Sequence, residues 1–193
     1  MALLKTMIGV GLLWLAVRIT LVDASLWIGW TGMIGLILVL HFGTFHLLSI
    51  LLRTLGIPAF PIMNAPLRAG SLSEFWGRCW NRPFNHLTVT YVFNPLARRL
   101  GATAAMTISF LLSGLIHELV ITVPARGGYG LPTIYFAIQG LGLWLERSAP
   151  IRRHPWVNRV FAWAILVLPL GLLFPPVFIN RIILPMLVAL GDG

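Results

Sequence analysis

Residues 104–123 read AAMTISFLLSGLIHELVITV, an apolar run that contains one histidine, His117. A helix of this length spans about 30 Å, which is the thickness of the hydrocarbon core of a bilayer. The run therefore predicts a helix that crosses a membrane. Ionisable side chains are rare inside such helices and are candidates for a functional role, because the protein must compensate for their lost hydration. His117 is thus the first residue whose role needs an explanation.

The composition of the whole chain is typical of a membrane protein. The chain has 193 residues, of which 58% are hydrophobic and 10% are charged, whereas a soluble domain carries about 25% charged residues. The formal net charge is +9, and nearly all the cations are arginines. They flank the apolar runs, which makes membrane topology a better explanation than nucleic-acid binding. The single cysteine, Cys79, excludes an intramolecular disulfide and a cysteine-based zinc cluster.

The apolar runs predict an all-α, polytopic protein with about five or six transmembrane helices in a single integral-membrane domain, residues 1–193. The first run is expected to remain as a span, because no clear small-residue cleavage site follows it. The run from Leu26 to Leu52 is either one tilted helix or a helix broken near Gly43. The last run is either a short span or a re-entrant piece. The expected spans cover about residues 6–22, 26–52, 102–124, 131–146, 157–174 and 177–190.

Residues 56–100 have a different character from the N-terminal spans in 1–55 and the C-terminal spans in 101–193. Five prolines between positions 58 and 95 forbid a continuous span, and the arginines predict a cytoplasmic or interfacial location. The same positive-inside rule predicts that Lys5 and the N-terminus are cytoplasmic, whereas Asp23 and Arg126 are outside. The bias for arginine over lysine favours a bacterial genome, and hence a bacterial inner membrane. A second basic loop, also expected inside, contains Arg147, Arg152, Arg153 and Arg159.

Residues 71–83, SLSEFWGRCWNRP, predict a short amphipathic helix. Ser71 and Glu74 fit a capping box at its start, and Pro83 is expected to stop it after two to three turns. Its aromatic residues fall on one side and its charged residues on or near the other. This pattern is typical of a helix that lies in the membrane interface with its aromatic rings as anchors.

Several roles for His117 can be compared from the residues alone. A zinc motif of the HExxH type needs a second histidine at position 121, where Ile121 stands. His41 and His46 are five residues apart and lie on different helix faces, so we expect no metal site. A serine-hydrolase motif G-x-S-x-G does not occur. A hydrogen bond to a neighbouring helix, for packing alone, is the remaining structural role.

Three stretches together resemble the membrane-bound O-acyltransferase superfamily, and in particular its wax-synthase-like branch. They are SLSEFWGRCWN at 71–81, YVFNP at 91–95 and FLLSGLIHEL at 110–119. The branch carries an S-L-x-E-F-W-G-R-x-W-N motif before an S-G-x-x-H-E motif, in the same order as here. HFG at 41–43 is also similar to that branch.

The resemblance implies transfer of a fatty acyl group from acyl-coenzyme A, the co-substrate, to a hydroxyl of a lipid acceptor, with no further cofactor. His117 corresponds to the family's catalytic histidine and Asn81 to its second polar active-site position. A neutral imidazole can take the proton of the hydroxyl as it attacks the thioester. An asparagine amide can bind the developing oxyanion or orient the acceptor. For the two to share a site, residues 71–95 must dip toward the membrane interior.

Other side chains near the two motifs are expected to contact substrate. Cytoplasmic arginines, Arg98 and Arg99 among them, can meet the phosphates of coenzyme A or act only as topology signals. The predicted substrate-binding residues are Trp76, Arg78, Trp80, Arg82, Ser113 and Glu118.

Two alternative functions come from other classes. A transporter or proton relay would use the same histidine, but it would need more intramembrane carboxylates than Glu118. A non-catalytic or truncated membrane subunit is favoured by length, because wax synthases of this kind have more N-terminal spans. The expected partners are acyl-coenzyme A, a hydroxyl-bearing lipid and the bilayer, and a homo-oligomer is compatible with the sequence. The sequence does not determine the acceptor or the acyl length.

Overall fold

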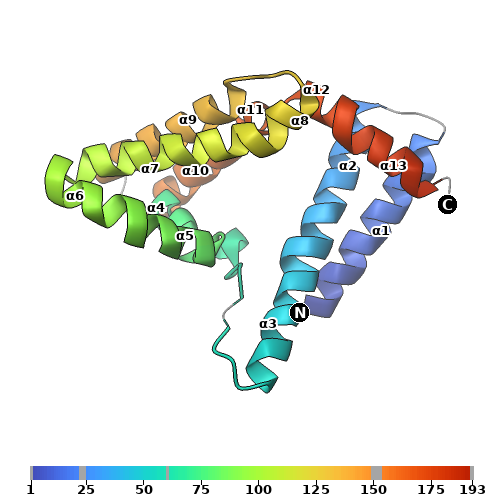
Figure 1. Ribbon diagram of the computed structural model, residues 1–193, viewed down its shortest axis with the longest axis horizontal. Helices are drawn as coiled ribbons and strands as arrows, with labels where there is room; N and C mark the ends of the chain where they lie inside the picture. The colour runs from blue at the N-terminus through green and yellow to red at the C-terminus, as the bar shows by residue number, and fades with distance from the viewer. Residues whose placement is uncertain (1, 22–24, 60, 149–153, 192–193) are drawn as a thin grey trace. The chain divides into compact units, whose positions relative to one another are not determined.

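The computed structural model describes residues 2–21, 25–59, 61–148 and 154–191, and these residues form helices and connecting turns without a strand (Figure 1). The prediction of an all-α polytopic protein is confirmed. Asp23, Arg152 and Arg153, which entered the topology prediction, lie outside the described residues. The contacts between residues divide the chain into two compact units, Met1–Met63 with Pro176–Gly193, and Asn64–Pro175. The single membrane domain stays a prediction.

In the first unit, α1 (Ala2–Thr20) packs along α2 (Leu26–Ile37) (Figure 1). The helix of α2 continues through a π-helical segment, Leu38–Thr44, into α3 (Phe45–Thr54), so the expected span 26–52 is one continuous helix. Gly43 lies inside the π-helical segment and does not break it. The short α12 (Pro176–Phe178), a π-helical turn (Ile179–Ile183) and α13 (Leu184–Gly191) follow at the C-terminal end.

The helices α1 and α2 approach each other closely at glycines. A β-carbon on Gly35 would lie 2.9 Å from the backbone nitrogen of Leu13, and one on Gly9 would lie 3.0 Å from the carbonyl oxygen of Gly35. Small residues that let two backbones meet are typical of helix pairs in membranes, where apolar burial gives no net attraction between helices.

The second unit contains both sequence motifs. Its core helices are α7 (Ala102–His117), α9 (Leu131–Ser148) and α10 (Pro155–Val167). The helical run of α5 (Arg82–Thr88) and α6 (Asn94–Leu100) joins α7 at Gly101, where φ is +84°, and α6 lies along α7 (Figure 1). The shorter elements are a 3-10 turn (Pro66–Arg68), α4 (Leu72–Glu74), a π-helical turn (Phe75–Cys79), α5 (Arg82–Thr88), a π-helical turn (Val89–Phe93), α6 (Asn94–Leu100), a π-helical turn (Glu118–Thr122), α8 (Val123–Ala125) and α11 (Leu170–Leu173).

Four helices of the described part of the chain are long and apolar enough to cross a membrane: Leu3–Thr20, Leu26–Thr54, Ala102–Ala125 and Pro155–Leu173. They correspond to four of the expected spans. The expected span 131–146 is the helix α9, which is not among the four. Pro176–Gly191 is apolar but shorter.

The buried side chains of α9 recur at intervals of three and four residues, so one face of this helix packs inward. Its neighbours in the core come from the 71–79 motif and from α7 and α10, and they include Leu72, Phe75, Met106 and Leu166. The motif therefore packs onto the core of the second unit, next to the helix that carries His117.

Candidate active site

The 71–79 motif begins with the predicted cap. The hydroxyl of Ser71 accepts a hydrogen bond from the backbone nitrogen of Glu74 at 3.0 Å, and the Glu74 carboxylate accepts one from the backbone nitrogen of Gly70 at 2.8 Å. In the predicted capping box the glutamate would bond to the backbone nitrogen of Ser71, whereas here it bonds to that of the preceding residue, Gly70. The prediction that Pro83 stops this helix was wrong, because the helix ends at Cys79 and Pro83 lies in the first turn of α5. Proline fits there since its missing N–H would have no partner in the helix.

Asn81 forms the turn between these two helices. Its backbone has φ +40° and ψ +60°, a left-handed conformation that asparagine tolerates better than most residues. Its Oδ1 accepts a hydrogen bond from the backbone nitrogen of Phe84 at 3.4 Å, so the side chain also caps α5. Asn81 therefore has a structural role, because it forms the turn and caps α5.

The aromatic side of the motif packs against other helices of the unit. Phe75 and Cys79 are buried, Trp76 and Trp80 are half-buried, and Arg78 on the other side is exposed. Trp80 stacks on Phe75 with ring centroids 5.4 Å apart. Further ring contacts join Phe75 to Trp163 at 6.2 Å, and Trp76 to Phe110 at 5.8 Å and to Phe136 at 5.7 Å. These rings pack the motif against α7, α9 and α10. A helix that only anchored the chain in the membrane interface would not need such contacts.

His117 is half-buried near the end of α7. Its Nδ1 lies 2.7 Å from the carbonyl oxygen of Ser113, one turn earlier on the same helix. A carbonyl oxygen can only accept, so Nδ1 carries the proton of the neutral ring and Nε2 carries the lone pair. No residue in the described part of the chain hydrogen-bonds to Nε2. The histidine therefore bonds within its own helix, not to a neighbour, and its free nitrogen is the basic one.

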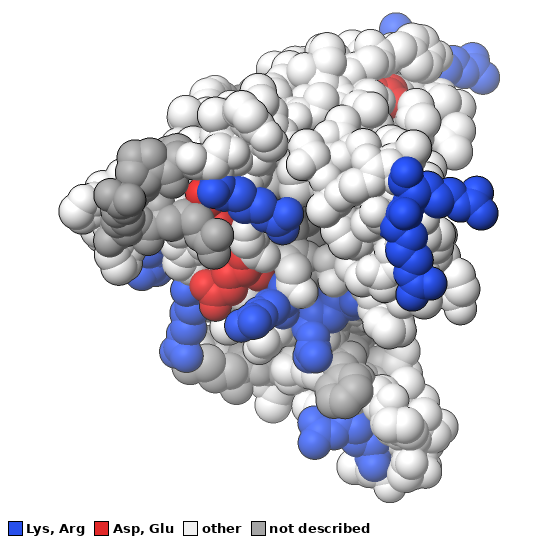
Figure 2. Space-filling view, turned by 90° about the vertical axis from the view of Figure 1, so that its left-hand side faces the viewer, with Lys and Arg blue, Asp and Glu red and all other residues white. Residues whose placement is uncertain are grey.

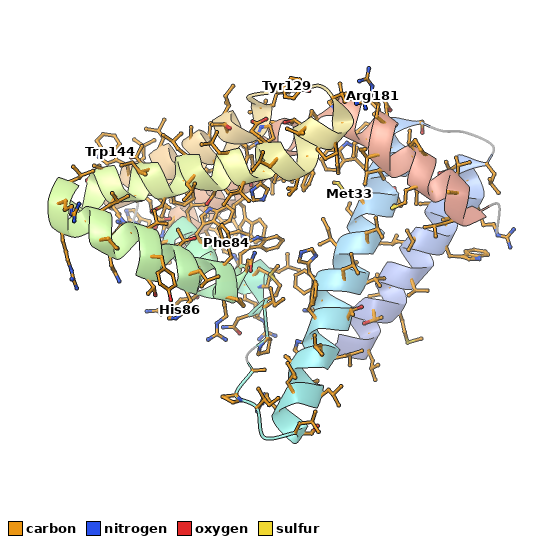
Figure 3. All side chains as sticks on the ribbon, in the orientation of Figure 1. Met33, Phe84, His86, Tyr129, Trp144 and Arg181 are labelled. Atoms are coloured by element: carbon orange, nitrogen blue, oxygen red, sulfur yellow. The ribbon has the colours of Figure 1, made fainter. Side chains whose placement is uncertain are left out.

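The two motifs meet directly at Trp76 and Phe110, and a phenylalanine of α9 also connects Trp76 to His117. The rings of His117 and Phe136 are 4.5 Å apart, and Phe136 is the same ring that touches Trp76. Trp76 thus reaches His117 through Phe136, while a shared site for Asn81 and His117 stays a prediction. Side chains fill the space between α5 and α7, where Phe84 points inward while the exposed His86 points away (Figure 3).

Glu118 and Ser113 use their polar atoms within the protein. The Glu118 carboxylate accepts hydrogen bonds from the backbone nitrogen and hydroxyl of Thr133 at 3.1 and 3.0 Å, and from the hydroxyl of Thr122. The buried hydroxyl of Ser113 donates to the carbonyl oxygen of Ser109 at 3.0 Å. Glu118 thereby ties the end of α7 to the first turn of α9. Substrate contact by these two residues stays a prediction.

Two polar residues of α9 were missed by the sequence reasoning. Gln139 is 0% exposed, accepts from Trp76 Nε1 at 3.3 Å and donates to the carbonyl oxygen of Ile165 at 2.8 Å. Glu146 is 1% exposed and binds the start of the motif helix. The available signal was their spacing, because Gln139 and Glu146 are seven residues apart and therefore lie on one face of a largely apolar helix.

The described residues contain no group of three or more metal-ligating side chains. The expectation of no metal stays a prediction.

Comparison with known proteins identifies the family. Residues 59–138 match the membrane bound O-acyl transferase family. The chain is 31% identical to the probable long-chain-alcohol O-fatty-acyltransferase 9 of Arabidopsis thaliana over 68% of this chain and 43% of that protein. It is 35% identical to the long-chain-alcohol O-fatty-acyltransferase of Simmondsia chinensis over 34% of this chain and 21% of that protein. Diacylglycerol O-acyltransferase 1 of Arabidopsis thaliana is 39% identical over 30% of this chain and 11% of that protein.

The chain belongs to the membrane-bound O-acyltransferase superfamily. The two long-chain-alcohol acyltransferases support its wax-synthase-like branch. The matched range contains both Asn81 and His117. This superfamily member spans less than half the length of the curated relatives named above. No solved structure gives a significant match to it.

The family and the apolar helices make the chain an integral membrane protein. The relatives named above are plant proteins. The bacterial inner membrane and the cytoplasmic N-terminus stay predictions, as do the homo-oligomer and the choice between acceptors.

The arginines of this acyltransferase-family chain lie mainly at its surface. Arg78, Arg98 and Arg99 are exposed, whereas Arg82 is half-buried at the start of α5. On the face of the molecule in Figure 2, Lys and Arg side chains are numerous and acidic side chains are few. Exposed guanidinium groups can pair with phosphate oxygens through two parallel hydrogen bonds.

Proposed function

We infer that this chain transfers a fatty acyl group from acyl-coenzyme A to a hydroxyl of a lipid acceptor, with His117 as the general base. The observation that carries the proposal is the imidazole itself. Its Nδ1 donates to the Ser113 carbonyl, and its Nε2 is left as a proton acceptor within an apolar helix. Membership of the superfamily supports the same reaction, because the relatives named above are O-acyltransferases.

The reaction needs a base because a hydroxyl is a poor nucleophile at neutral pH. Nε2 of His117 takes the hydroxyl proton while the acceptor oxygen attacks the thioester carbonyl carbon and forms the new C–O bond. The C–S bond then breaks, and the imidazolium returns the proton to the departing sulfur. The bond from Nδ1 to Ser113 holds the ring in place and stabilises its charged form. General-base assistance is typically worth about 10²–10⁴-fold in rate.

Neighbouring residues have supporting roles in this proposal. Phe136 and Trp76 give the histidine an apolar wall, and exclusion of water protects the thioester from hydrolysis. Asn81 supplies an amide to the oxyanion or to the acceptor, a role that is supported by the motif and by its place beside the Trp76 helix. The exposed arginines of the 71–100 segment bind the phosphates of coenzyme A.

The test is ester formation by the purified chain in detergent or nanodiscs. A long-chain acyl-coenzyme A is supplied with a long-chain alcohol, a diacylglycerol or a sterol, and the ester is measured by mass spectrometry. We expect ester with at least one acceptor and a loss of about 100-fold or more in His117→Ala. His117→Gln, which can keep a hydrogen bond to Ser113 but is no base, should be equally inactive.

The matched control is His86→Ala, which removes an exposed histidine of α5. It should retain the wild-type rate. Full activity of folded His117→Ala would refute the mechanism, and activity of His117→Gln would reduce the histidine to a packing role. No ester with any acceptor, together with proton flux into liposomes without acyl donor, would favour a transporter.

A further inference from the structure

Glu146 is a buried carboxylate in the last turns of α9, and it is bonded to the start of the motif helix. Its Oε2 accepts a hydrogen bond from the backbone nitrogen of Leu72 at 2.6 Å. Its Oε1 accepts from the backbone nitrogen and the hydroxyl of Ser73, at 3.2 and 2.6 Å. The side chain is 1% exposed, so it is removed from solvent and depends on these three donors.

The three donors belong to the first turn of the 72–79 helical run, where backbone N–H groups have no partner within the helix. A carboxylate at this position satisfies two of these groups and is favoured by the helix dipole. Trp76 lies one turn further along this run, and Gln139 of α9 holds its indole nitrogen. Glu146 and Gln139 thus fix one short helix to one face of α9 at two points.

The same helix α9 also positions His117. Phe136 touches the imidazole, and Thr133 binds the carboxylate next to it. Along α9, Thr133 and Phe136 therefore contact the His117 region first. Gln139 then binds the indole of Trp76, and Glu146 binds the start of the motif helix last. Both motifs are thus bonded to α9, in addition to the direct ring contact between Trp76 and Phe110.

We propose that Glu146 is a positioning residue of the acyl-transfer site, which aligns the motif helix with His117 through α9. Glu146 lies outside the range 59–138 that matches the family. The proposal rests on the proposed acyl transfer. It assigns Glu146 no contact with substrate, because its carboxylate is occupied by Leu72 and Ser73.

The test is Glu146→Gln in the full chain, which keeps the size of the side chain but turns one acceptor oxygen into a donor. That NH₂ group would face a backbone N–H or the Ser73 hydroxyl, so the motif helix must shift. Misplacement by about 1 Å can cost on the order of 100-fold in rate. We expect kcat per folded molecule to fall at least about tenfold, while KM for acyl-coenzyme A changes less than about threefold.

Cys79, the single cysteine, provides a second readout on the motif helix itself. It is 5% exposed in the folded chain, so maleimide should label it slowly. Glu146→Gln should label severalfold faster than wild type, because the helix start is released. His117→Ala should lose activity without faster labelling, which separates loss of the base from loss of alignment.

Glu74→Gln is the matched control, because it neutralises an exposed carboxylate on the same helix. The amide oxygen of the glutamine can still accept the hydrogen bond from the backbone nitrogen of Gly70. It should keep the wild-type kcat, and its labelling should rise only as far as the lost charge of Glu74 lowers the pKa of the Cys79 thiol. Wild-type kcat and slow labelling in Glu146→Gln would overturn the proposal. If that variant yields no folded protein, Ser73→Ala decides, since unchanged kcat and labelling there would also overturn it. An inactive wild-type chain would instead refute the proposed function.

Discussion

Gly114→Ala should separate the two helices that carry the site. Gly114 lies on α7, one turn before His117, and faces the start of α9. A β-carbon at this position would lie 2.7 Å from the Cα of Thr133. Two carbon atoms in contact prefer a separation of about 3.5–4.0 Å. The helices must therefore move apart by roughly 1 Å, because the atom in the way is backbone and no side-chain rotation relieves the contact.

The size of the effect follows from two opposing contributions. Overpacking typically costs about 1–3 kcal/mol, whereas glycine to alanine inside a helix gains up to about 1 kcal/mol. We expect a net loss of about 1–2 kcal/mol in the free energy of unfolding. A shift of roughly 1 Å would also lengthen the bond from Thr133 to Glu118 and move Phe136 from the His117 ring. That misalignment should lower kcat by up to about 100-fold.

The assay is the acyl-transfer rate per folded molecule, with the thermal midpoint of the detergent-solubilised protein measured in parallel. Gly171→Ala is one control, because a β-carbon added there would meet nothing within 4 Å. Gly140→Ala is a second, on α9 itself, where the nearest atom would be Phe110 Cβ at an ordinary 3.5 Å. Both should keep the wild-type rate. Wild-type rate and midpoint in Gly114→Ala would refute the claim that close contact of α7 and α9 aligns the site.

Two further predictions concern the motif segment. Asn81→Gly keeps the left-handed backbone and removes the amide, so it should fold normally but lose at least about tenfold in kcat. Asn81→Ala should in addition lose about 1–2 kcal/mol of stability, because alanine disfavours the left-handed conformation. Wild-type kcat in Asn81→Gly would leave Asn81 a conformational role only. Burial, together with the negative charge of Glu74, raises the pKa of the Cys79 thiol. Only the thiolate reacts, so maleimide labelling should increase at a higher pH than for an exposed cysteine; a profile centred at or below the ordinary value of about 8.5 would contradict this burial.

The motif segment, residues 71–83, shows which structural features neighbouring residues are sufficient to predict. The cap at Ser71 and the two-sided helix were predicted correctly, because both depend on residues within one or two turns. The end of that helix was predicted incorrectly, because Pro83 is equally suited to begin a helix, and the left-handed Asn81 decided between the two. Local chemistry thus predicted the start of the element but not its end.

The hydrogen-bond partners of helix α9 could not be predicted from neighbouring residues. The sequence predicted it as one more span, yet Gln139 and Glu146 bind the motif across 63 and 74 residues of sequence. Their hydrogen-bonding groups required partners, but many backbone N–H groups and side chains could have served. Only the packing of α4 and α10 on α9 selected Trp76, Ile165 and Leu72.

The sequence by itself determined a helical membrane protein, the acyltransferase resemblance and the candidate histidine, because hydropathy and short motifs are properties of neighbouring residues. The tertiary structure decided which nitrogen of His117 is free, that Phe136 lies between it and Trp76, and that α9 holds both motifs. The physical reason is that a ring contact or a buried hydrogen bond depends on distances between helices. Those distances are set by side-chain packing, such as the close approach at Gly114, and not by the order of residues along one helix.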